Sequence, residues 1–344
     1  DPLWSRGLGD VYKRQIQQVF ISGLTLKSYR NYENFTTKLE SGCVVIYGGN
    51  GCGKTNLLEA ISLLAPGRGL RRAAYRQLCN INNETPFIIN ANIKSKKYGE
   101  VNIGTSVNEA ATSRKLYINQ SPTSIDNLTE YCTILWLTPL MDRLFIGPAS
   151  DRCRFLDRLV LSIDVGHGKR LRDYAKMIKI RNHFLQQTHT KNKLLDTYEA
   201  TIANLAVEIG QARKHLVIIL NKAIEASEYN ELFIKSNIYI KGEVEEILSQ
   251  YNMEEAFHII LQKLYINREA DKIAGRCKFG PHRSDFCIEY KEKNMPAHLC
   301  STGEQKSLLV NLILSQLELN IQLFNKHSIC LLYTSPSPRD QRGS

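Results

Sequence analysis

The chain has 344 residues, enough for one large domain or two ordinary ones, and its 43% apolar and 23% charged content is that of a soluble globular protein. Its net charge of +11 favours a polyanionic partner, with nucleic acid as the first candidate. The longest apolar runs are too short to cross a bilayer, and the nine cysteines stand singly without a C-x-x-C pair. These features argue against a membrane protein, a zinc ribbon and a disulfide scaffold, and we expect a cytoplasmic protein.

The two ends of the chain differ from the remainder. Residues 1–15 and residues 333–344 resemble translated adapter or linker sequence, and the tail is crowded with turn-forming residues. We therefore expect a non-native leader and a non-native tail, and leave both out of the fold prediction.

The first native segment predicts β-structure. Between Ile16 and about Leu39, alternating apolar residues in Val19–Ile21 and Leu24–Leu26 predict a pair of strands. Farther along, the apolar and β-branched run Cys43–Tyr47 predicts a buried strand, and Asn56–Leu64 predicts a helix with one apolar face.

Between that strand and that helix lies a complete phosphate-binding loop of the form G-x-x-x-x-G-K-[ST]. Its glycines allow backbone N–H groups to approach phosphate oxygens, and the helix start adds partial positive charge. Lys54 is expected to reach the β- and γ-phosphates, and the Thr55 hydroxyl to ligate Mg²⁺. The alternative is an ordinary glycine-rich turn, which the full pattern disfavours. The predicted ATP-binding residues are Gly48, Gly49, Asn50, Gly51, Cys52, Gly53, Lys54 and Thr55.

The rest of the first half is mixed α/β. Arg68, Arg71, Arg72 and Arg76 form a basic cluster around a Pro-Gly turn. Short β-like runs follow at Phe87–Ile89, Lys115–Ile118 and Ile134–Leu137.

From residue 151 to about residue 225 the pattern is strongly helical. Apolar residues recur at spacings of three and four along a seam of about four heptads, which favours an antiparallel helical hairpin. The alternative is one long amphipathic helix packed on the core. The later seam comprises Leu195, Tyr198, Ile202, Leu205, Ile209, Ala212, Leu216, Ile219 and Ala223, and its partner comprises Leu171, Tyr174, Ile178, Arg181 and Leu185.

The first helix of this pair also carries a row of cations. Lys169, Arg172, Lys176 and Lys179 follow at spacings of three or four, which places them on one helical face. Such a stripe can follow a phosphate backbone, although a solvated surface is the simpler explanation for an isolated run of charge.

Strand-like runs return at Ile238–Ile240 and Phe286–Tyr290, and a second candidate nucleotide motif begins at Ser301. Ser301 and Glu304 fit a capping box before an apolar helix. Because the motif follows a phosphate-binding loop, it also resembles the signature of ABC-superfamily ATPase heads, which presents a serine and a helix N-terminus to the ATP of the opposite subunit. That resemblance assigns Ser301, Gly303, Glu304 and Gln305 to a site completed by a second subunit.

Between Val19 and about Leu332, several separated motifs resemble those of the bacterial RecF family and follow one another in the same order as in that family. They are Leu26–Tyr32, Trp136–Pro139, the run Asp151-Arg152-x-Arg154-Phe155-Leu156-Asp157, and Gly280–Phe286. The resemblance implies an α/β P-loop ATPase head of the ABC/SMC type with an inserted helical arm. It places the head in residues 16–150 and 271–332, and the arm in residues 151–270.

The resemblance also implies a function. It predicts an ATP- and Mg²⁺-dependent DNA-binding protein that acts in gap repair, DNA replication and SOS induction with RecO, RecR and RecA. Two heads would enclose ATP between the loop of one and Ser301 of the other, on single-stranded, duplex or gapped DNA. The DNA candidates become Arg68, Arg71, Arg72, Lys169, Arg172, Lys176 and Lys179.

Two departures from the family pattern affect the expected chemistry. Leu140 stands where an acid or amide is expected, and the strand Ser328–Leu332 is not followed by the Asp-Glu pair of a Walker B motif. We therefore expect this chain to bind ATP with negligible hydrolysis, whereas the family would be weak ATPases. The alternatives are an ABC transporter ATPase subunit, which would need a membrane-domain docking surface, and an SMC-like clamp, which would need a longer coiled coil.

Overall fold

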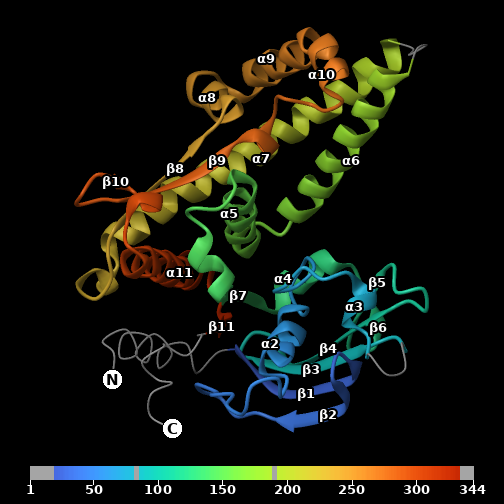
Figure 1. Cartoon of the computed structure of the whole chain (residues 1–344), viewed down its shortest axis with the longest axis vertical. Helices are drawn as coiled ribbons and strands as arrows, with labels where there is room; N and C mark the ends of the chain where they lie inside the picture. Colours follow the sequence, from blue (N-terminus) through green and yellow to red (C-terminus); the bar gives the residue numbers. More distant parts are fainter. Residues whose placement is uncertain (1–18, 81–84, 188–191, 334–344) are drawn as a thin grey trace. The chain divides into compact units, whose positions relative to one another are not determined.

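The computed structural model describes residues 19–80, 85–187 and 192–333 (Figure 1). The chain divides into two compact units, the first built from residues 1–142 and 320–344 and the second from residues 143–319. The leader expected over residues 1–15 lies outside the described residues, as does the tail beyond Tyr333.

An antiparallel sheet of six strands forms one side of the first unit, in the order β2-β1-β3-β4-β5-β6. The pair of strands expected between Ile16 and about Leu39 is confirmed as β1 and β2, but both apolar runs that predicted it lie on β1, whose register shifts between Ile21 and Gly23. This irregularity resets the alternation, so that Ile21, Leu24 and Leu26 are all buried. The strands are β1 (Val19–Tyr29), β2 (Tyr32–Lys38), β3 (Ile88–Ser95), β4 (Gly99–Val107), β5 (Arg114–Ile118) and β6 (Ser121–Pro122).

Helix α2 (Lys54–Ser62) follows the phosphate-binding loop, as expected, and joins the apolar core of this unit. Leu57 and Ile61 belong to the same buried cluster as residues of β1, β3 and β4. Strand β7 (Thr133–Leu137) pairs in parallel with β11 (Ser328–Leu332), which confirms both of these strand predictions. The short elements are α3 (Tyr75–Leu78), η1 (Ile125–Asn127), α4 (Leu128–Tyr131) and η2 (Pro139–Arg143).

The segment before the phosphate-binding loop is not the buried strand that its composition predicts. Cys43–Tyr47 has no regular secondary structure, and Val45 and Tyr47 are 75% and 89% exposed. An extended segment becomes a strand only where a neighbouring backbone accepts and donates its ladder hydrogen bonds. Here the segment instead lines a cavity of about 620 Å³ together with residues of β1 and β11.

The second unit combines helices with the three-stranded antiparallel sheet β10-β9-β8. This unit extends beyond the arm expected over residues 151–270, because β9, which follows that segment, pairs along its whole length with β8 inside it. Its helices are α5 (Ala149–Ile163), α6 (His167–Gln186), α7 (Asn192–Ala226), η3 (Glu228–Glu231), α8 (Glu243–Gln250), α9 (Met253–Ile266), α10 (Arg268–Ala274), η4 (Pro281–Arg283), η5 (Ala297–Leu299) and most of α11 (Thr302–Phe324), and its strands are β8 (Ser236–Lys241), β9 (Asp285–Tyr290) and β10 (Met295–Pro296).

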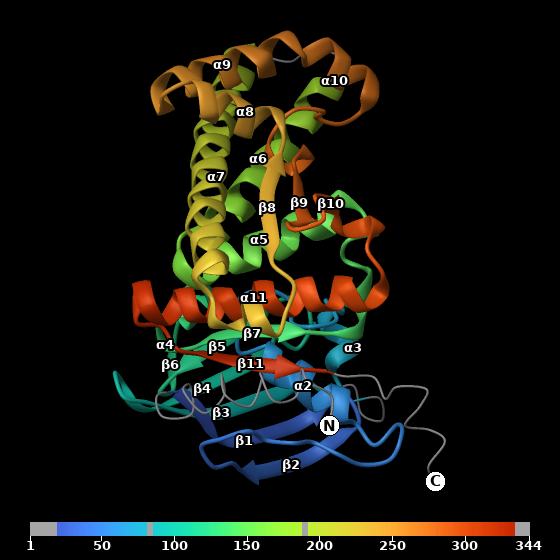
Figure 2. The ribbon, with the colours of Figure 1, turned by 90° about the vertical axis from the view of Figure 1, so that its left-hand side faces the viewer.

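Helices α6 and α7 lie side by side (Figure 1, Figure 2). Arg170 pairs with Glu208 and Arg181 with Glu199, so residue numbers run in opposite directions along the two helices and the hairpin is antiparallel. Helix α7 also packs against α8 and α9, with Ala203, Ala206 and Val207 in their shared core. Helix α7 is therefore both one arm of the predicted hairpin and a helix packed on a core, as the alternative prediction described.

One seam position of α6 holds a fully buried guanidinium. Arg181 donates from Nε to Glu199 at 2.8 Å, from Nη1 to Asp271 at 2.7 Å and from Nη2 to the Leu264 carbonyl at 2.8 Å. A planar group with donors on several edges can satisfy partners from separate helices at once. The arginine thereby fixes α6 against α7, α9 and α10.

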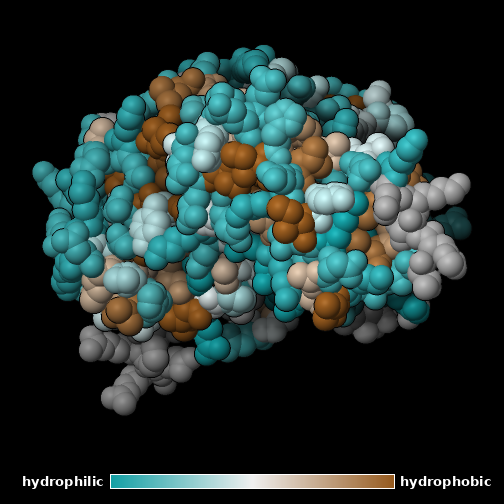
Figure 3. Space-filling view, turned by 90° about the horizontal axis from the view of Figure 1, so that it is seen from above, coloured by the Kyte–Doolittle hydropathy of each residue, from teal (hydrophilic) through white to brown (hydrophobic). Residues whose placement is uncertain are grey.

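Hydrophobic residues also reach the surface. Figure 3 shows them as separate brown groups among hydrophilic neighbours on the face seen from above. Ile266 and Ile273 in the α9–α10 region are 67% and 87% exposed. Among the described residues α11 alone is long and apolar enough to cross a membrane, but 67% of its apolar window is buried in the structure, as in a core helix.

The Arg181→Met variant is expected to destabilise the protein by about 3–5 kcal/mol, because it leaves the fully buried Asp271 carboxylate without the counter-charge of Arg181, whereas Glu199 keeps its pair with Arg268. Urea unfolding followed by circular dichroism measures this loss. The control is Lys263→Met, which removes a half-exposed pair with Glu243 and should cost less than about 1 kcal/mol. Equal losses in the two variants would contradict the assigned role of Arg181.

Candidate nucleotide-binding site

The phosphate-binding loop turns into α2 through glycines in left-handed backbone conformations. Gly51 has φ +82° and Gly53, the residue that caps α2, has φ +101°. A Cβ atom at Gly53 would lie 2.7 Å from Asn31 Nδ2 and 2.8 Å from the Tyr32 hydroxyl. Both the conformation and the space therefore require glycine at this position.

The outer surface of the loop is open. A Cβ atom added at Gly49 or Gly51 would meet nothing within 4 Å, and residues 48–52 are exposed. The N-terminus of α2 has no side-chain cap, so its first backbone N–H groups are available to an anion. The eight predicted ATP-binding residues thus form one continuous, accessible loop and helix start.

Lys54 is held over this loop by the loop itself. Its Nζ donates to the Gly48 carbonyl at 2.6 Å and to the Gly49 carbonyl at 2.7 Å. The ammonium group therefore lies across the turn, where it adds a full charge to the partial charge of the helix end. Thr55 is the second residue of α2 and is half-buried.

The turn between β1 and β2 and the first residue of β2 support the loop. The Tyr32 hydroxyl donates to the Gly53 carbonyl at 3.2 Å, and Asn56 Nδ2 donates to Asn31 Oδ1 at 2.7 Å. Arg30 makes a two-point ion pair with Glu59 of α2, with both N–O distances at 3.0 Å. The sequence identified Leu26–Tyr32 only as a motif that resembles the RecF family. Its support of the phosphate-binding loop could not be predicted, because the two segments are distant in the chain.

The basic cluster after α2 is tied to the same helix. Arg71 donates to Asn56 Oδ1 at 2.9 Å and lies 3.6 Å from the Glu59 carboxylate. The Arg68 guanidinium lies 5.9 Å from the centre of the Tyr75 ring. Arg68, Arg71 and Arg72 are all exposed, so the cluster places positive charge beside the phosphate-binding loop.

The candidate signature motif starts α11 in the second unit. The Ser301 N–H donates to Glu304 at 2.8 Å and the Glu304 N–H donates to Ser301 Oγ at 3.4 Å, so the capping box is formed. The hydrogen bond from Lys293 and the one from the Ser301 amide lower the pKa of Glu304 to about 2. Gln305 is buried and donates to the Cys300 carbonyl, whereas Gly303 has open space beside it.

The four cations of α6 lie where the spacing predicts. Lys169, Arg172, Lys176 and Lys179 are all exposed, while Tyr174, Arg181 and Leu185 of the same helix are buried. The stripe is therefore a surface feature of the helix and is separate from its packing seam.

Two further family-marker motifs, around residues 151–157 and 280–286, meet in the second unit. Arg152 makes a two-point ion pair with Asp285 at 2.7 and 2.8 Å. Asp157 accepts two hydrogen bonds from Arg213, which also donates to the Pro281 carbonyl at 2.7 Å. Burial alone would raise the pKa of Asp157, but the charge of Arg213 and the hydrogen bonds that Asp157 makes with His167 and Arg213 outweigh it and hold that pKa below its ordinary value.

The loop pattern predicts one protein contact for the metal, the Thr55 hydroxyl. Among the residues that it describes, no group of three or more His, Cys, Asp or Glu side chains is placed to hold an ion. Leu140 lies in η2, and its side chain is outside the described residues. Thr55 remains the candidate contact for Mg²⁺, in the position that the loop pattern predicts.

Known proteins match nearly the whole chain. The AAA domain family matches residues 23–273. The DNA replication and repair protein RecF of Brucella abortus (strain 2308) is 42% identical over 327 residues, which cover 94% of this chain and 84% of the relative. The chain belongs to the RecF family. RecF of Mesorhizobium japonicum is also 42% identical, over 321 residues that cover 92% of this chain and 84% of the relative.

Solved RecF structures share this fold, which confirms the predicted ABC/SMC-type fold class. The structure described as "the recombination mediator protein RecF-ATP in RecFOR pathway" matches with a TM-score of 0.81 at 20% identity, and covers 94% of this chain and 90% of that chain. A second RecF structure, described as RecF-ATPrS, matches with the same TM-score and covers 92% of this chain and 86% of that chain.

Proposed function

We propose that this RecF family member is an ATP-dependent DNA-binding protein of the cytoplasm that acts in recombinational gap repair, replication maintenance and SOS induction with RecO, RecR and RecA. The observation that carries the proposal is the open loop of residues 48–53 with Lys54 held across it. The family relationship supplies the biological setting. This relationship also disfavours an ABC transporter subunit and an SMC clamp, because the chain aligns with 84% of the length of a relative named RecF.

ATP would bind with its phosphates on the loop and the start of α2. Backbone N–H groups around Gly51 and Gly53 would donate to the phosphate oxygens, and Lys54 would exchange its carbonyl partners for the β- and γ-phosphates. The Thr55 hydroxyl would hold Mg²⁺, which neutralises phosphate charge when it is bound. Asn31 and Tyr32 would keep the loop in shape, because they bond to its end and to α2.

Replacing Lys54 by Met should weaken ATP binding by about ten- to a hundredfold, since the variant loses a charge-assisted hydrogen bond to the triphosphate. Isothermal titration with Mg·ATP measures the effect. The exposed Lys38 of the same unit provides the control, because Lys38→Met should leave the affinity unchanged. An unaltered dissociation constant in Lys54→Met would overturn the assignment of the loop.

Two copies would close on ATP. The γ-phosphate bound in one copy would contact the exposed Ser301 and the amides of the α11 start in the other. Ser301 and Gly303 suit this role because both are exposed and Gly303 has open space beside it. ATP would favour the dimer because its contacts with the second copy exist only in the closed state.

The Ser301→Arg variant should keep its affinity for ATP but lose ATP-dependent dimers, because the large cation occupies the space of the γ-phosphate. Multi-angle light scattering with and without Mg·ATP measures this. Ser301→Thr, which retains a hydroxyl that can cap α11, is the control and should still dimerise. Normal dimers of Ser301→Arg would show that Ser301 is only a helix cap.

DNA would bind the cationic stripe of α6, and the arginine cluster beside α2 is a separate candidate contact. Replacing the four stripe cations by Gln should weaken DNA binding and flatten its salt dependence by about 0.9 in log–log slope for each lost phosphate contact. Fluorescence anisotropy over a salt series measures both quantities. Four other exposed cations of the second unit give a matched control, which should bind as the unmodified protein does: Lys222, Lys272, Arg276 and Lys278. Equal loss in both sets would remove the stripe from the proposal.

A further inference from the structure

The segment Gly280–Asp285 turns through η4 into the start of β9, and the proposed ATP binding and dimerisation do not use it. Gly280 has φ +131°, and a Cβ atom at this position would lie 2.2 Å from the Tyr174 hydroxyl oxygen. Only glycine therefore allows this backbone to pack against α6.

Two polar side chains of the segment are bonded inside the second unit. The Tyr174 hydroxyl of α6 donates to His282 Nδ1 at 2.8 Å, and His282 Nε2 donates to the Cys277 carbonyl at 3.1 Å. Ser284 Oγ donates to the buried Glu245 carboxylate of α8 at 2.6 Å. Both side chains therefore hold the turn in place.

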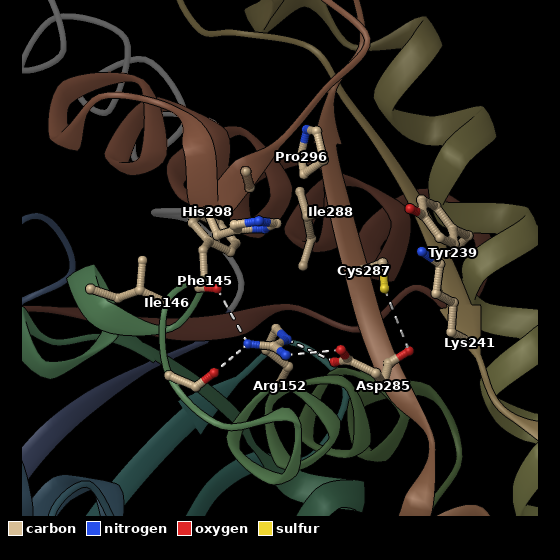
Figure 4. Close-up of a pocket in the computed structure, with 12 residues that line it drawn as sticks. Phe145, Ile146, Arg152, Tyr239, Lys241, Asp285, Cys287, Ile288, Pro296 and His298 are labelled. Atoms are coloured by element: carbon tan, nitrogen blue, oxygen red, sulfur yellow. Dashed lines mark hydrogen bonds and ion pairs between the residues drawn. The ribbon is translucent and has the colours of Figure 1, made fainter.

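Two further helices bond to the same segment. Arg213 of α7 donates to the Pro281 carbonyl at 2.7 Å, and Arg152 of α5 makes its two-point ion pair with Asp285 (Figure 4). The segment is thus bonded to α5, α6, α7 and α8. Its backbone is fixed before any ligand binds, which lowers the entropic cost of binding through a side chain that it carries.

Arg283 is the exception in this segment. It is exposed, and its guanidinium has no hydrogen bond or ion pair among the residues that the structure describes; only its backbone N–H donates, to the Gly280 carbonyl at 2.9 Å. A guanidinium presents planar pairs of N–H donors that match phosphate oxygens. The segment therefore holds an unpaired anion-binding group on a fixed backbone.

A second cation lies on the neighbouring strand. Lys241 ends β8 and stands opposite Asp285 in the register of the two strands. It is exposed, it lines the pocket drawn in Figure 4, and its ammonium group lies 5.4 Å from the centre of the Tyr239 ring. Within the described part of the chain, no carboxylate forms an ion pair with it.

The two cations are close enough for one ligand to reach both. Cross-strand partners are about 5 Å apart and two residues span at most about 7 Å, so the backbones of Lys241 and Arg283 lie within about 12 Å of each other. One DNA strand carries several phosphates over that distance.

We infer that Arg283 and Lys241 form a contact for the phosphate backbone of DNA in the second unit, in addition to the cationic stripe of α6. The inference rests on the proposed DNA binding and names further residues that carry it. The net charge of +11 favours a polyanion at these positions, and evenly spaced phosphates can engage both cations at once. The role of the Gly280–Asp285 segment is to hold Arg283 in a fixed place for this contact.

The test measures binding of a fluorescein-labelled gapped duplex by anisotropy, with the full chain in Mg·ATP over a salt series. Arg283→Gln and Lys241→Gln should each weaken binding about three- to tenfold and reduce the log–log salt slope by about 0.7–0.9, the value for one lost phosphate contact. Arg283→Lys, which keeps the charge, should keep the slope. The matched control is Arg276→Gln, which removes another exposed arginine a few residues earlier and should bind as the unmodified protein does.

A double-mutant cycle tests the role of the segment. Tyr174→Phe keeps the ring but removes the hydrogen bond to His282, and should weaken DNA binding by about two- to threefold because Arg283 is then held less firmly. In the Arg283→Gln background the same change should have no further effect. An equal effect in both backgrounds would overturn the role given to the segment.

The outcomes separate this inference from the proposed DNA binding. If the unmodified chain does not bind the gapped duplex, the proposed DNA binding fails and this contact fails with it. If the α6 stripe variant loses affinity while Arg283→Gln and Lys241→Gln keep the affinity and slope of the unmodified protein, only this contact is overturned, and an acidic protein surface becomes the anion to test there. An equal loss in Arg276→Gln would also overturn it, because the effect would then reflect net charge alone.

Discussion

The phosphate-binding loop depends on the hydrogen bonds that hold it from behind. Its outer face must stay bare so that backbone N–H groups can meet an anion, and a bare glycine-rich turn has little to fix its own conformation. Tyr32 supplies a bond to the Gly53 carbonyl, and Arg30 fixes α2 through Glu59. The loop is thereby shaped for phosphate before any ligand arrives, which lowers the entropic cost of binding.

The second unit uses buried charge in a similar way. Arg181 connects helices of the arm, and Arg213 connects α5 and α7 to the segment before β9. Ion pairs in an interior add little net stability compared with apolar packing, but their geometry is specific. Their contribution here is to hold particular helices and the start of β9 in one arrangement, and β9 leads through β10 and η5 to Ser301.

Elements whose formation depends on local sequence were predicted well. Helix α2, the helices between residues 149 and 226 and the strands β7, β9 and β11 all lie where periodicity and composition place them. The predictions that differ from the structure concern the pairing of strands. Cys43–Tyr47 has the composition of a strand but no ladder partner among the described residues, and the two runs at Val19–Leu26 form one strand because a register shift lets both face the same core.

The sequence by itself determined the phosphate-binding loop, the helix that follows it, the cationic face of α6 and the capping box at Ser301. Each of these is a local pattern, in which residues a few positions apart fix the backbone or share a helical face. Only the tertiary structure decided that Tyr32 supports Gly53 and that Arg152 meets Asp285. Those relations join residues that are distant in the chain, and they depend on how the elements pack, which no local pattern specifies.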